Sequence, residues 1–305
     1  MAGNPQLLDS FRTRLDSFAR ELPGVADGSV EALHRARVAS RRLRELLPVV
    51  GLDRDAARKL TRQLRRVTRR LGTVRELDVQ MLLLDEYEQR KRFSSAALGR
   101  VRHVVAQQQE AARERLEEKL PARKLQRLVA RLERAAGSVR PADEKPRRSA
   151  SGAAGKHSAA WALDARLARR AADVRRAIEA AGALYAPEPI HDVRIAIKKL
   201  RYAAELSLEA GARFTAEVSA LKGAQGLLGQ LHDCEVLVAA GRDVQASLVP
   251  PDLSTWRGLN VLLHAVEDDC RQLHARYMRD RTRLLAIADR LGAGRAVTGD
   301  KRAAG

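Results

Sequence analysis

Two segments of the sequence repeat a histidine and several cations at helical spacing, and their side chains are those that bind anions. The first segment, HRARVASRRLRELL, runs from His34 to Leu47, and the second, HDVRIAIKKLRYAA, runs from His191 to Ala204. They align without a gap. Guanidinium groups donate paired hydrogen bonds to phosphate oxygens and stay charged. The candidate ligand-binding side chains are His34, Arg37, Arg41, Arg42 and Arg44, and in the second copy His191, Arg194, Lys198, Lys199 and Arg201.

A helix with 3.6 residues per turn places most of these cations in a single stripe. The stripe in the first copy is His34, Arg37, Arg41 and Arg44, and in the second it is His191, Arg194, Lys198 and Arg201. Apolar residues fill the adjoining face, so the cations are predicted at the rim of packed surface. A solvated helix face is the ordinary explanation of such a row. Two copies that keep the charges and the histidine at equal spacing favour a functional role.

The two histidines leave two interpretations open. His34 and His191 either strengthen anion binding as the pH falls through about 6.5, or they only cap and pack the start of each helix. A further stripe follows on the next predicted helix. It consists of Arg58, Arg62, Arg65 and Arg69, with Lys222 opposite Arg65 in the second copy. A solvated face is the default for this stripe, and Arg65, Arg69 and Lys222 are kept as candidates.

A second pair of motifs shows that the whole unit is duplicated. LGTVRELDV begins at Leu71 and LGQLHDCEV begins at Leu228, and these motifs have the same offset of 157 residues as the histidine segments. Each unit is predicted to contain about four helices, a size at which antiparallel bundles bury their apolar stripes. Arg75 and His232 each follow a glycine at a predicted helix start. Free backbone N–H groups there favour anions, which makes both residues candidates.

Composition predicts a globular protein with a partner of opposite charge. The chain has 305 residues, 45% of them hydrophobic, with a net charge of +19 and a pI near 10.9. Such a surface attracts nucleic acid, acidic membranes or polyphosphate. Aromatic residues make up only 3%, which weakens a single-stranded nucleic-acid reading because base stacking needs them. Cys234 and Cys270 have no metal-type spacing and are predicted to be buried thiols.

The pattern along the chain predicts an all-α fold, with Pro and Gly separating the helices. The halves are predicted at 6–136 and 160–291, joined by a mobile basic linker at 137–159 and followed by a disordered tail at 292–305. The sequence shows no apolar leader, and no apolar run approaches the roughly 18 residues that a membrane span needs. We therefore expect a cytoplasmic protein without a membrane partner. The predicted helices are 5–22, 29–47, 53–71, 76–90, 94–137 with a kink or break at Pro121, 160–181, 190–209, 212–228, 233–248 and 254–291.

The paired H-x-x-R-[VI]-A-x-[RK]-[RK]-L-R segments, each followed by L-G-x-x-[RH]-[DE]-x-[DE]-V, resemble the CHAD domain, the conserved histidine α-helical domain. The resemblance covers about Gln6 to Leu291. It implies two four-helix bundles related by a pseudo-two-fold axis, with a basic central cavity where they meet. It also implies binding of inorganic polyphosphate and, in some bacteria, association with polyphosphate granules. We therefore expect a binding protein without enzymatic activity or a cofactor.

Several alternatives remain. The basic surface also suits non-specific DNA or RNA binding, although no recognition motif is found. Glu31 and Glu188 each precede a histidine by three residues, the E-x-x-H spacing of di-iron bundles, but Glu188 precedes a proline and the nearby arginines repel divalent cations. A phosphoacceptor histidine lacks an ATP-binding partner domain. Glu86-x-Glu88-x-Arg90 resembles a triphosphatase signature, but it lies on a predicted helix where a strand is needed, and is interpreted as solvated surface.

Overall fold

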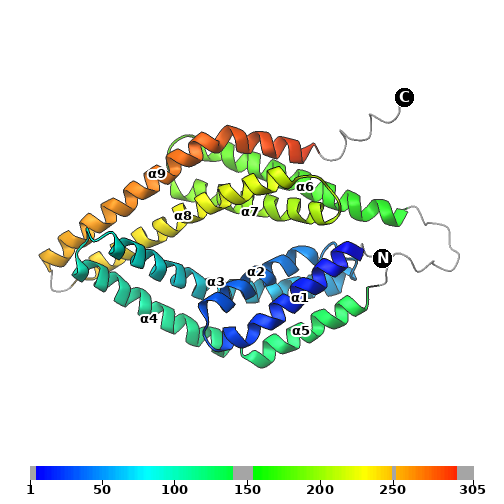
Figure 1. Cartoon of the computed structure of the whole chain (residues 1–305), viewed down its shortest axis with the longest axis horizontal. Helices are drawn as coiled ribbons and strands as arrows, with labels where there is room; N and C mark the ends of the chain where they lie inside the picture. The colour runs from blue at the N-terminus through cyan, green and yellow to red at the C-terminus, as the bar shows by residue number, and fades with distance from the viewer. Residues whose placement is uncertain (1–4, 140–153, 249–251, 294–305) are drawn as a thin grey trace.

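A computed structural model describes residues 5–139, 154–248 and 252–293 (Figure 1). The described residues form helices without any strand, which confirms the all-α prediction. The helices are α1 (Pro5–Ala26), α2 (Val30–Leu46), α3 (Arg54–Gln89), α4 (Ser95–Lys119), α5 (Ala122–Gly137), α6 (Ala154–Ala181), α7 (Pro187–Glu209), α8 (Thr215–Ala246) and α9 (Leu253–Gly292).

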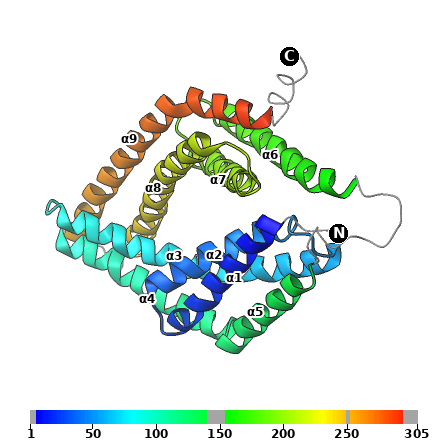
Figure 2. The same cartoon turned by 45° about the vertical axis from the view of Figure 1, so that its right-hand side comes forward.

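The helices pack as two groups that follow the order of the chain (Figures 1 and 2). In the first group α1 packs on α2 and α5, α2 packs on α3, and α3 packs on α4. In the second group α6 packs on α7 and α9, and α8 packs on α7 and α9. The long hairpins α3–α4 and α8–α9 converge at one end of the molecule, where α4 contacts both α8 and α9. The predicted pseudo-two-fold relation between the groups stays a prediction.

The hydrophobic core crosses from one group to the other at this convergent end. One cluster of buried side chains is built from α6 to α9. The other cluster contains the core of α1 to α5 and also buried residues of α8 and α9, including Leu237, Leu262 and the two free cysteines, Cys234 and Cys270. Tyr87 of α3 adds a polar contact there, since its hydroxyl donates to Asp269 of α9 at 2.6 Å. The shared core and this hydrogen bond therefore hold the two groups together at this end.

The predicted helix breaks near the two motif glycines are wrong. α3 runs without interruption through Gly72, and α8 runs through Gly229, so the predicted pairs of shorter helices are single long helices. A glycine inside a helix costs only about 1 kcal/mol relative to alanine. Burial of the flanking residues, such as Leu71 and Leu228, offsets that cost because both side chains are fully covered.

Most other boundaries agree with expectation, but four differ by three residues or more. α1 ends at Ala26, four residues after the predicted end, and α8 begins at Thr215, three residues after the predicted start. The chain breaks at Pro121, as predicted, between α4 and α5. α7 begins at Pro187, three residues before the predicted start, so Glu188 is helical and the proline argument against it was wrong. α6 begins at Ala154 and takes in the end of the predicted linker, whereas 140–153 and most of the predicted tail lie outside the described residues. Across the described ranges, no helix is long and apolar enough to cross a membrane.

Candidate anion-binding site

The first set of candidate cations lies on α2, whose start is fixed by Ser29. The Ser29 hydroxyl accepts a hydrogen bond from the backbone N–H of Ala32 at 3.2 Å, which caps the helix. Leu33 and Leu43 are buried against neighbouring helices and set the rotation of α2 about its axis. That rotation leaves the stripe at the edge of the core. Its members are the exposed His34 and the half-buried Arg37, Arg41 and Arg44.

Arg37 packs against a helix position that has no side chain. A Cβ added to Gly72 of α3 would lie 3.3 Å from Arg37 Nε and 3.8 Å from Nη2. The same Nε is buried without a hydrogen-bond partner among the described residues. Gly72 therefore makes room for a guanidinium whose hydrogen-bonding capacity is incompletely used. Gly229, at the equivalent position of α8, has no atom within 4 Å of an added Cβ.

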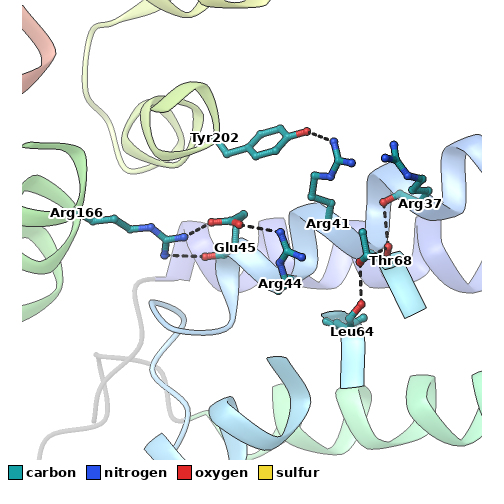
Figure 3. A network of polar contacts seen from close by, with 9 residues as sticks. Arg37, Arg41, Arg44, Glu45, Leu64, Thr68, Arg166 and Tyr202 are labelled. Atoms are coloured by element: carbon teal, nitrogen blue, oxygen red, sulfur yellow. Dashed lines mark hydrogen bonds and ion pairs between the residues drawn. The ribbon is translucent and has the colours of Figure 1, made fainter. Parts of the chain in front are cut away.

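α7 brings the second set of cations opposite α2. Arg194 and Lys198 are half-buried and lie one turn apart on α7, and Tyr202 follows one turn later. Arg41 Nη1 donates a hydrogen bond to the Tyr202 hydroxyl at 3.0 Å. Figure 3 shows Arg37 and Arg41 pointing from α2 toward the side where Tyr202 lies. The contact places the α2 cations beside those of α7, between the two groups of helices.

The cations are close enough to lower one another's pKa values. Burial, followed by the charges of Arg41, Arg194, Arg37 and Arg44, lowers the pKa of Lys198 to about 7. Burial and then Arg41 lower the pKa of Arg37 to about 10, with Arg194 as a further contributor. Burial also lowers the pKa of Arg194. We call these five residues, Arg37, Arg41, Arg44, Arg194 and Lys198, the cation cluster.

Most of the cation cluster forms no direct ion pair, although Asp233, Glu76 and Glu235 lie near enough to act against the lowering of the Arg194 pKa. Arg44 lies 3.4 Å from Glu45. Among the described residues, no carboxylate oxygen lies within 4.0 Å of the charged nitrogens of Arg37, Arg41, Arg194 or Lys198. Charges held together in a partly dry environment without counter-ions are unfavourable. An anion that entered the cluster would relieve this repulsion and restore the lowered pKa values.

Histidines lie at the amino-terminal end of both cation stripes. The rings of His191 and His232 are 4.8 Å apart. His232 Nε2 lies 3.7 Å from Glu76 and Nδ1 lies 3.7 Å from Glu235. Contacts with Glu235 and Glu76 raise the pKa of His232 to about 8, whereas burial and then His232 lower the pKa of His191.

His34 is more exposed and lies near several arginines. Partial burial, followed by the charges of Arg75, Arg37 and Arg41, lowers its pKa. Arg75 acts on His34 and His232 lies beside His191, and both residues are in the middle of α3 and α8. The predicted contribution of free backbone N–H groups at a helix start was wrong because no helix begins there.

The remaining predicted residues lie outside the cation cluster. Arg201 is buried and donates to Glu205 at 2.9 Å, and Arg42 lies 3.9 Å from the same carboxylate. These two arginines have counter-ions and are less available to an anion. The other four predicted cations are exposed, namely Arg65, Arg69, Lys199 and Lys222.

Sequence reasoning missed three side chains that shape the site. Tyr202 lies within the repeated segment, but its counterpart is Glu45, so the comparison of the two copies gave no signal. Glu205 forms an ion pair with Arg201 four residues earlier on α7, so helical spacing held this signal, although the first copy has Pro48 at that position. Glu76 was visible, because its position is acidic in both copies, with Asp233 as its counterpart.

Ion pairs join the two groups of helices beside the cation cluster (Figure 3). Arg166 of α6 pairs with the Glu45 carboxylate and donates to the Glu45 carbonyl at 3.1 Å. Arg14 of α1 donates to Glu209 of α7 at 3.1 Å. A small, partly open cleft lies there, and it is mixed in charge. It is lined by Arg14, Arg42, Glu45, Tyr202, Glu205, Leu206 and Glu209. The basic central cavity implied by the resemblance stays a prediction.

Two other motifs have structural surroundings that bear on their chemistry. Within the described ranges, no three His, Cys, Asp or Glu side chains form a group suited to a metal ion. In the Glu86-x-Glu88-x-Arg90 segment, Glu88 accepts from Arg102 at 2.7 Å and Arg90 pairs with Asp269 at 2.7 Å. Two of its three charged residues therefore form ion pairs between helices, which the interpretation as solvated surface did not foresee.

These observations define an all-α protein in which two groups of helices hold a partly buried cation cluster between them. Residues 9–242 match the family model described as the CHAD domain, and the chain belongs to this family. The resemblance noted from the motifs is thereby confirmed. No curated protein matches the sequence.

Solved structures agree with this assignment at the level of the fold. PptA from Streptomyces chartreusis is 18% identical, with a TM-score of 0.57 over 96% of this chain and 98% of that chain. The CHAD domain from the plant Ricinus communis is 21% identical, with a TM-score of 0.54 over 97% of this chain and 93% of that chain.

Proposed function

We propose that the protein binds inorganic polyphosphate through the cation cluster, without catalysing a reaction on it. The observation that carries this proposal is the gathering of partly buried cations from α2 and α7, four of which have no carboxylate within 4.0 Å among the described residues. Assembling them costs free energy in the absence of a ligand, so the arrangement suits a protein that binds a polyanion.

Polyphosphate fits the chemistry of the cluster better than other polyanions. It carries about one charge per phosphate and presents only oxygen acceptors, which guanidinium forks bind in pairs. The aromatic side chain at the site is that of Tyr202. Its hydroxyl accepts a hydrogen bond from Arg41 at 3.0 Å, and the guanidinium carbon of Arg201 lies 4.7 Å from its ring centroid. It is therefore not free to stack on a nucleobase. Membership in the CHAD family, which is associated with polyphosphate, supports the same ligand.

Non-specific nucleic-acid binding is the second candidate. The observation that favours it is a basic stripe on α3, separate from the cation cluster and exposed along its length. Its residues are Arg58, Arg62, Arg65 and Arg69. Together with a net charge of +19, such a surface attracts phosphate backbones without reading bases. We place the protein in the cytoplasm in this proposal, and at polyphosphate granules in cells that form them.

Competition binding distinguishes the two candidates. Labelled long-chain polyphosphate is bound to the full chain at physiological salt and then displaced by unlabelled polyphosphate, duplex DNA or RNA at matched phosphate concentration. The proposal expects polyphosphate to displace the label at a concentration at least about tenfold lower than either nucleic acid, since shaped contacts add to the general salt-dependent attraction. Equal displacement by all three would instead favour the general basic surface.

A further inference from the structure

Lys198 occupies a distinctive place in the cation cluster. It lies on α7 one turn after Arg194 and one turn before Tyr202, and Tyr202 is bonded to Arg41 of α2 at 3.0 Å. Lys198 is half-buried. Its ammonium group has no hydrogen-bond partner and no carboxylate within 4.0 Å in the part of the chain that the structure describes. The amine is therefore held among arginines with nothing to neutralise or protect it.

The surroundings of Lys198 meet the first requirement for a nucleophilic amine, which is a neutral nitrogen. Burial and the nearby arginines lower its pKa to about 7. About half of the Lys198 side chains are then unprotonated at neutral pH, against less than roughly 0.1% for a lysine with an ordinary pKa near 10.4. Desolvation beside other cations is a recognised way of activating a lysine nucleophile.

The second requirement is delivery of an electrophile, and the same arginines supply it. Their guanidinium groups bind phosphate through paired hydrogen bonds. A small electrophile that carries a phosphate would be concentrated beside the amine, whereas an uncharged one would not. Proximity of this kind raises the effective concentration of a reactant strongly.

We propose that Lys198 is a covalent modification site that acyl phosphates acylate without an enzyme. This proposal rests on the proposed function, because the arginines that would hold polyphosphate also hold the phosphate of the acyl donor. The neutral Nζ attacks the carbonyl carbon, a C–N bond forms, and the C–O bond to phosphate breaks. One amine proton passes to the departing inorganic phosphate. The product is a neutral amide, so acylation removes a cation from the cluster and weakens polyphosphate binding.

Lys199 provides a matched control within the same peptide. It follows Lys198 directly, is exposed, and lies on another face of α7 because consecutive helical residues are about 100° apart. The full chain is treated briefly with acetyl phosphate at neutral pH, and acetylated peptides are located by mass spectrometry. We expect acetylation of Lys198 to exceed that of Lys199 by at least about tenfold, because Lys198 lies among the arginines that bind the phosphate of the donor. Equal or preferential acetylation of Lys199 would overturn the proposal.

An uncharged donor tests the role of the arginines. Phenyl acetate is substituted for acetyl phosphate, and the ratio of Lys198 to Lys199 acetylation is expected to fall several-fold because recruitment by phosphate is lost. An unchanged ratio would refute recruitment and, with it, the proposal.

Protection by polyphosphate separates this proposal from the proposed function. Excess long-chain polyphosphate should slow acetylation of Lys198 and leave Lys199 unaffected. Selective acetylation of Lys198 without any protection would support the modification site and contradict polyphosphate binding at the cluster. Protein that binds polyphosphate in a direct assay but shows no preference for Lys198 would keep the proposed function and refute the modification site.

Discussion

Polyphosphate binding should take up a proton at Lys198. In the free protein the pKa of this lysine is lowered to about 7 by burial and by the arginines around it. A bound phosphate favours the charged ammonium and raises the pKa. Because the bound form holds more protons than the free form near neutrality, affinity should rise as the pH falls and decrease as the pH rises above about 7.

The magnitude follows from the fraction of Lys198 that is already charged. With a pKa of about 7, roughly nine in ten side chains are charged at pH 6 and roughly one in ten at pH 8. Charging the amine before binding costs about 1.4 kcal/mol more at pH 8 than at pH 6. This group alone should therefore make polyphosphate binding about tenfold weaker at pH 8 than at pH 6.

Isothermal titration calorimetry in buffers of different ionisation enthalpy measures this proton uptake directly. The Lys198→Arg variant keeps a charge at all these pH values, so its uptake and its pH dependence should be smaller than those of the wild type. His232, with a pKa raised to about 8, accounts for part of the slope that remains. Lys199→Arg is the matched control and should behave as the wild type. Identical pH dependence in the wild type and Lys198→Arg would refute the reasoning.

The other predictions concern the glycine that packs against Arg37 and two ion pairs that differ in burial. Gly72→Val should weaken polyphosphate binding several-fold by displacing Arg37, which lies 3.3 Å from an added Cβ, whereas Gly229→Val has open space and should not; equal effects in fluorescence binding assays would exclude this role for Gly72. Glu209→Gln should lower the free energy of unfolding in urea by about 1–2 kcal/mol because it leaves a half-buried arginine unpaired. Glu118→Gln breaks an exposed pair and should change nothing measurable; a cost as large as that of Glu209→Gln would contradict the assignment.

The repeated segments predicted those features of the site that depend on the residues of a single helix. The spacing of Arg37 and Arg41 fixes their common stripe, and a buried Leu43 fixes the direction in which that stripe points. The same spacing made Arg201 look equivalent to Arg44. Arg201 instead is buried and paired with Glu205. Glu205 lies four residues after Arg201 on the same helix, so the pair was within reach of helical spacing, whereas the comparison of the two copies alone did not show it.

The glycine motifs show a second limit of sequence reasoning. Gly72 and Gly229 were interpreted as helix ends, since glycine has the lowest helix propensity after proline. In α3 the glycine instead leaves space for Arg37, a contact that spans 35 positions of the sequence. Only tertiary packing shows that the small size of this residue matters here and its conformational freedom does not. The contact from Arg41 to Tyr202 joins the two halves and was equally outside the reach of local patterns.

Two matched sets of substitutions test the central claim most directly. One variant replaces four residues of the cation cluster with alanine, namely Arg37, Arg41, Arg194 and Lys198. The other replaces the exposed stripe of α3, namely Arg58, Arg62, Arg65 and Arg69. Each removes four basic side chains, so general attraction to a polyanion falls similarly in both.

Direct titration with long-chain polyphosphate at physiological salt is the decisive measurement, with circular dichroism to show that both variants keep their helices. The account predicts at least about a hundredfold loss of affinity in the cluster variant, since charge-assisted hydrogen bonds contribute about 1.5–3 kcal/mol each. It predicts a loss of only a few-fold in the α3 variant. Equal losses in the two variants, or a greater loss in the α3 variant, would contradict binding at the cation cluster.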